Sequence, residues 1–133
     1  MKKGIVLLVD RHPTDLEGIM GLLGAEFDSV IMVSDEASLV GALPRLDPDL
    51  VIVDQSFQVA QASDVITLLK KYNSKLKIIA LCSYEAPEFM KHCRSSGASG
   101  YILKRSAAKD LIKAVDEVSR GGIFVPSDIV TSK

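Results

Sequence analysis

Five short apolar runs recur along the chain at regular intervals. Each is rich in Val and Ile and has the length of a single strand. Because each is continuously apolar instead of alternating with polar residues, it is typical of a strand buried on both faces of a parallel sheet. The runs cover residues 4–10, 29–34, 49–54, 77–83 and 100–103.

The segments between these runs carry apolar residues at helical spacing. Gly24 and Gly97 are placed to end two of the helices. The alternation of strands and helices predicts an α/β protein. We expect a three-layer, doubly wound parallel five-stranded sheet with strand order 2-1-3-4-5. The clearest helical stripes are Leu16, Ile19, Met20, Leu22 and Leu23, and then Leu111, Ile112, Val115 and Val118.

Composition narrows the class of protein. The 133 residues suffice for one domain, and 47% hydrophobic with 25% charged residues is typical of a globular chain. The net charge of −1 gives no basic surface for nucleic acid, and no apolar run is long enough to cross a membrane. Two cysteines, Cys82 and Cys93, favour a reduced, cytoplasmic location.

Candidate chemistry gathers where the predicted strands end. In such sheets ligands bind beyond the carboxyl ends of the strands. Two acids, a lysine, a thiol and a hydroxyl are therefore expected to converge in one cleft. The residues at these ends are Asp10 and Arg11, Asp54, Cys82 and Ser83, and Lys104.

Four motifs resemble the response-regulator receiver domain, and the resemblance extends from about Ile5 to Gly122. They are "VDRHP" (9–13), "PDLVIVD" (48–54), "GASGYILK" (97–104) and "VSRGGIFVP" (118–126). The first and last are similar to the NarL/FixJ type, in which a LuxR-type helix-turn-helix follows the receiver. The resemblance implies a flavodoxin/CheY-like fold.

The resemblance also implies a phosphorylation switch. Asp54 would be the phosphoacceptor that takes a phosphoryl group from a sensor histidine kinase, without other enzyme activity. Asp10 and Asp54 would hold Mg²⁺, Lys104 would bind the phosphate, and Tyr101 would be the switch aromatic.

The sequence departs from that family pattern at several positions. Arg11 replaces the second acid, and Cys82 stands where a switch Thr or Ser is expected, with Ser83 as the neighbouring alternative. Phe57 and Gln58 replace the usual Met and Pro. We therefore expect an atypical receiver with a weak or absent Mg²⁺ site.

The orientation of Arg11 decides how weak that site is. A divalent ion about 4 Å from a guanidinium is repelled by about 8 kcal/mol at an effective dielectric of about 20. The guanidinium could pair with Asp54 or Asp10, or extend into solvent. Our hypothesis is that Arg11 pairs with Asp54, which favours a phosphorylation-independent module for interaction or dimerisation as the alternative function.

Other ligands have little support in the sequence. The first loop lacks the small polar residues of a flavin phosphate cradle, and no histidine and cysteine spacing indicates zinc.

The resemblance also suggests partners and boundaries. We expect a receiver at 1–122 and, at 123–133, the start of a linker to a C-terminal effector domain, through which alone the protein would bind DNA. No membrane partner is expected. A homodimer could form through the fourth helix, fifth strand and fifth helix, around Glu88, Lys91, Tyr101, Arg105 and Lys113.

Overall fold

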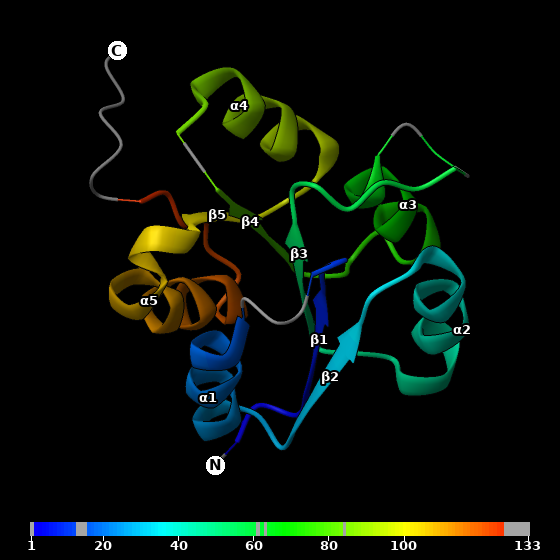
Figure 1. Ribbon diagram of the computed structural model, residues 1–133, viewed down its shortest axis with the longest axis horizontal. Helices are drawn as coiled ribbons and strands as arrows, with labels where there is room; N and C mark the ends of the chain where they lie inside the picture. The colour runs from blue at the N-terminus through cyan, green and yellow to red at the C-terminus, as the bar shows by residue number, and fades with distance from the viewer. Residues whose placement is uncertain (1, 13–15, 61, 63, 84, 127–133) are drawn as a thin grey trace.

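One parallel sheet forms the centre of the computed structural model (Figure 1). Residues 2–12, 16–60, 62, 64–83 and 85–126 are described. The order β2-β1-β3-β4-β5 confirms the prediction, and each apolar run contains one strand. The strands are β1 (Ile5–Val9), β2 (Ser29–Val33), β3 (Leu50–Asp54), β4 (Ile78–Cys82) and β5 (Gly100–Leu103).

Helices cover both faces of the sheet and complete the three layers. Side chains of successive strand residues point to opposite faces, so each strand contributes to two apolar clusters. Helices α1 and α5 cover one cluster, and α2, α3 and α4 cover the other. The helices are α1 (Glu17–Glu26), α2 (Glu36–Leu46), α3 (Val65–Tyr72), α4 (Pro87–Ser96) and α5 (Ala107–Ser119), with a 3₁₀ turn, η2 (Lys104–Ser106), before α5.

The two glycines expected to end helices behave differently. Gly97 follows α4 with φ of +122°, a conformation that other residues rarely adopt, and this part of the prediction is confirmed. Gly24 lies inside α1, which continues to Glu26, so the predicted end at Gly24 is wrong. An added Cβ at Gly24 would meet nothing within 4 Å, so no steric demand makes this glycine a terminator.

The segment after α5 returns to the edge of the sheet. The N–H of Tyr101 donates to Phe124 O at 3.2 Å, and the N–H of Phe124 donates to Ser99 O at 2.9 Å. The packed part of the chain thus extends beyond Gly122, the expected last residue of the domain. Among the described residues, no helix is both long enough and apolar enough to cross a membrane.

Candidate functional site

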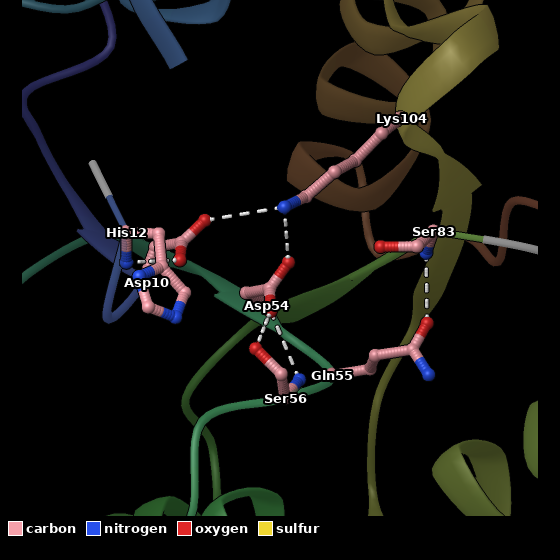
Figure 2. A network of polar contacts seen from close by, with 7 residues as sticks. All are labelled: Asp10, His12, Asp54, Gln55, Ser56, Ser83 and Lys104. Carbon is pink, nitrogen blue, oxygen red and sulfur yellow. Dashed lines mark hydrogen bonds and ion pairs between the residues drawn. The ribbon is translucent and has the colours of Figure 1, made fainter. Parts of the chain in front are cut away.

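An ion pair joins Asp54 at the end of β3 to Lys104 just after β5. Lys104 Nζ lies 2.7 Å from Asp54 Oδ1 and 3.4 Å from Asp10 Oδ2 (Figure 2). Both acids are buried, with exposed fractions of 2% for Asp54 and 1% for Asp10. The structure therefore brings these three predicted site residues together at the carboxyl ends of the strands.

The second oxygen of each acid is held by the loop that follows it. Asp54 Oδ2 accepts hydrogen bonds from the backbone N–H of Ser56, at 2.9 Å, and from the Ser56 hydroxyl. Asp10 Oδ1 accepts from the backbone N–H of His12 at 2.8 Å. Each carboxylate is thus anchored through one oxygen and presents the other to Lys104.

These contacts keep Asp54 and Lys104 charged. Burial raises the pKa of Asp54, but Lys104 and the Ser56 hydrogen bonds outweigh it, and the net pKa lies below the ordinary value. Burial lowers the pKa of Lys104, and Asp54 and Asp10 outweigh it, so the net pKa is raised. Asp54 is therefore an ionised carboxylate, as a nucleophile must be.

Arg11 does not make the predicted pair with Asp54. Its Nη2 donates to Gln58 O at 3.0 Å, and its guanidinium lies 5.2 Å from the centre of the Phe57 ring. The prediction is wrong because Lys104 already neutralises Asp54, while the carbonyl and the aromatic ring of the neighbouring loop offer Arg11 a contact close to solvent. Arg11 instead connects the loop after β1 to the loop after β3.

The donor set for a metal ion is incomplete. Two carboxylates, Asp10 and Asp54, face the cleft, and the ammonium of Lys104 contacts both. Within the described part of the chain, no group of three His, Cys, Asp or Glu side chains could hold a metal ion. Mg²⁺ takes one or two protein carboxylates together with waters, so Asp10 and Asp54 could supply ligands, but the ammonium of Lys104 contacts both of them.

Of the three candidate switch residues, two are buried and one is exposed. Cys82 is fully buried in the core, and burial raises the pKa of its thiol to about 12. Tyr101 is 1% exposed, and burial together with Cys82 raises the pKa of its phenol. Ser83 is exposed, and its backbone N–H donates to Gln55 Oε1 at 2.8 Å.

Sequence reasoning missed Ser56 and Gln55, which both contact the site. Each lies within two residues of Asp54, in the loop that leaves the end of β3. Polar side chains directly after a predicted site residue are the signal that could have identified them.

Of the residues expected to form the dimer face, one is buried and the others are exposed. Tyr101 is buried against Cys82 and Phe89 and so contributes no exposed area, contrary to the expectation. The other four residues of the set are exposed, namely Glu88, Lys91, Arg105 and Lys113.

Comparisons with known proteins show which family the chain resembles. A family model described as the response regulator receiver domain matches residues 6–116. The response regulator VraR of Staphylococcus aureus is 31% identical over 129 residues, which cover 94% of this chain and 61% of VraR. The transcriptional regulatory protein DegU of Brevibacillus brevis is 26% identical over 122 residues, which cover 90% of this chain and 52% of DegU. The chain thus spans less than two thirds of the length of these relatives.

Solved structures share the fold. The receiver domain of RcsB from Escherichia coli has a TM-score of 0.84 and 28% identity, covering 95% of this chain and 100% of that one. A complex of RcsB with DNA has a TM-score of 0.82 and 29% identity, covering 92% of this chain and 63% of that one. With the family model matching most of its length, the chain belongs to the response-regulator receiver family, and its relatives are response regulators of the LuxR/NarL type.

Proposed function

We propose that Asp54 accepts a phosphoryl group slowly, because the site binds Mg²⁺ weakly. The observation that supports this is the pairing of an ionised, anchored Asp54 with Lys104 in a cleft to which the described residues contribute two carboxylates. Asp54 would serve as the nucleophile and Lys104 as the cation beside the phosphate, while Arg11 stands where a further acid would strengthen the metal site.

The transfer itself needs one bond to form and one to break. An oxygen of the Asp54 carboxylate forms an O–P bond while the P–N bond of a phosphohistidine breaks. The electron pair of that bond stays on the imidazole nitrogen, which takes up a proton. Lys104 contributes a positive charge beside the phosphoryl oxygens.

The wider role of the protein follows from its relatives. We propose that a sensor histidine kinase is the phosphoryl donor and that the protein acts in the cytoplasm. RcsB has been solved in complex with DNA. We propose that this protein also binds DNA, through a C-terminal domain. We further propose that it forms a homodimer through the exposed charges around α4, β5 and α5.

A second candidate is an interaction module that does not depend on phosphorylation. Tyr101 is held by burial against Cys82 and Phe89, and a cysteine thiol is a weak hydrogen-bond donor. In the family, a hydroxyl at this position couples the phosphoryl group to the aromatic side chain. Replacing that hydroxyl with a buried thiol favours a Tyr101 position set by packing alone.

Phosphoramidate labelling followed by intact mass distinguishes the two candidates. We expect slow addition of one phosphoryl group, lost in D54N, with weak dependence on Mg²⁺. Labelling that is rapid and saturates at low Mg²⁺ would contradict the weak metal site. A complete lack of labelling would overturn phosphotransfer and favour the interaction module.

A further inference from the structure

The segment after α5 adds a short sixth strand to the edge of β5. Gly100 and Phe124 form a parallel bridge. The N–H of Phe124 donates to Ser99 O at 2.9 Å, and the N–H of Tyr101 donates to Phe124 O at 3.2 Å. Phe124 also packs against the apolar cluster that α1 and α5 cover. We refer to residues 122–126 as the strap.

The strap is held to the sheet by few contacts. Among the described residues, two backbone hydrogen bonds join it to β5 and the residue before β5. The ladder stops at Pro126, which has no N–H to donate to Tyr101 O. The strap follows a turn at Gly121, where φ is +91°, and Ile123 is 53% exposed. The strap can therefore open locally while the sheet stays folded.

A buried carboxyl group lies on the side of α5 that the strap follows. Asp110 is 1% exposed, and its Oδ2 has no hydrogen-bond partner in the described part of the chain. Glu117 is on the same side of α5, seven residues later, and its carboxylate lies beside Gly122. From Gly122 the strap runs parallel to β5 and so back along α5. Four extended residues cover about 13 Å, and the helix from Glu117 to Asp110 covers about 10 Å, so the strap reaches the level of Asp110.

This carboxyl group should weaken the closed strap. A buried polar oxygen without a partner is destabilising, and more so when the group carries a charge. Opening the strap would let water reach Asp110 and remove that cost. Phe124 thus stabilises the closed strap, and Asp110 opposes it.

We propose that the strap is a detachable cover on the edge of β5, which Phe124 holds closed and Asp110 biases toward release. When it opens, the edge of β5 at Tyr101 presents unpaired backbone groups, which readily pair with another chain. The occupant of the open edge is a second copy of this chain, so the strap restrains self-association. This last step rests on the proposed homodimer, whereas the opening of the strap does not.

The charges beside this edge suit a second copy. Glu88 on α4 and Lys113 on α5 are both exposed and have opposite signs. In a two-fold symmetric dimer, Glu88 of each copy can therefore face Lys113 of the other.

Amide hydrogen exchange of the full chain tests how the strap is closed. F124A removes the packed ring and is expected to raise the exchange rate of the Tyr101 amide about tenfold. I123A is the matched control, because Ile123 lies in the same strap and is largely exposed, and it should leave the rate unchanged. An unchanged rate in F124A overturns closure by Phe124.

The same measurement tests the bias toward release. D110N removes the charge and is expected to lower the exchange rate of the Tyr101 amide about threefold. D116N is the matched control on α5, since Asp116 is 44% exposed and contacts Lys3, and it should leave the rate unchanged. A rate in D110N equal to or above that of the unaltered chain overturns the role of Asp110.

Sedimentation velocity over a range of concentrations tests the restraint on self-association. F124A should strengthen dimerisation about tenfold or more, because the open edge is more populated, and D110N should weaken it. Equal dimer affinities of F124A and the unaltered chain overturn the restraint. If every variant stays monomeric while the exchange rates change as expected, the proposed homodimer is overturned and the restraint with it, and the detachable strap is supported.

Discussion

Lys104 Nζ lies 2.7 Å from Asp54 Oδ1, and this pair spans the sheet from β3 to β5 across β4. Asp54 is 2% exposed, so water does little to stabilise its charge. Lys104 and the Ser56 hydrogen bonds compensate for this, and the lysine also reaches Asp10. Loss of this ammonium would leave two buried carboxylates without their cation, which is destabilising.

Removing the lysine should destabilise the domain. In K104M two buried carboxylates lose their cation, and we expect a loss of about 2 kcal/mol in the free energy of unfolding, measured by urea denaturation. The double variant K104M/D54N should recover a large part of that loss because one of the two charges is gone. If the double variant were less stable than K104M, the unpaired charge would not be the cause.

The stability of the fold should fall in acid, partly because of Asp54. Its pKa is held below the ordinary value of 3.8, so its contribution is fully present above 3.8 and is lost as the pH falls through the folded pKa. D54N should therefore show a shallower decline in unfolding free energy below pH about 4. Asp35 and Asp64, whose pKa values are also lowered, should keep part of the slope. An identical slope in D54N would contradict the assigned pKa direction.

Restoring an acid beside Asp10 should restore metal binding. R11D supplies a third carboxylate near Asp10 and Asp54 and removes a cation, so we expect Mg²⁺ affinity to rise about tenfold or more, measured by calorimetry. R11A is the control, because it removes the charge without adding a ligand. If R11A binds Mg²⁺ as well as R11D, the guanidinium rather than the missing acid weakens the site.

Sequence patterns predicted the sheet because burial on both faces leaves a strong signal. Every expected strand and the strand order were confirmed, and the ends of the strands correctly brought Asp10, Asp54 and Lys104 together. The orientation of Arg11 could not be predicted in the same way. It depends on contacts with the Gln58 carbonyl and the Phe57 ring, which lie 47 and 46 residues away along the chain. It also depends on the pairing of Lys104 with Asp54.

The cap of α3 should contribute more to stability than the contact between Asp64 and His92. Asp64 accepts a hydrogen bond from the Thr67 N–H at 2.8 Å and contacts His92 Nε2 at 2.7 Å. D64A removes both and should cost about 1 kcal/mol. H92A removes only a partner that is 53% exposed and should cost less than about 0.5 kcal/mol. Equal losses in a thermal or urea melt would show that the His92 contact dominates.

Two glycine substitutions should change stability in opposite directions. At Gly97 the backbone has φ of +122°, and an added Cβ would lie 2.8 Å from Lys70 Cε, so G97A should lose about 1–2 kcal/mol. At Gly24 the helix continues and an added Cβ meets nothing within 4 Å, so G24A should gain about 0.5–1 kcal/mol from the lower entropy of the unfolded chain. Urea midpoints measured side by side check both. Destabilisation by G24A would contradict the helical assignment there, and a neutral G97A would mean that the turn after α4 accommodates a side chain by shifting.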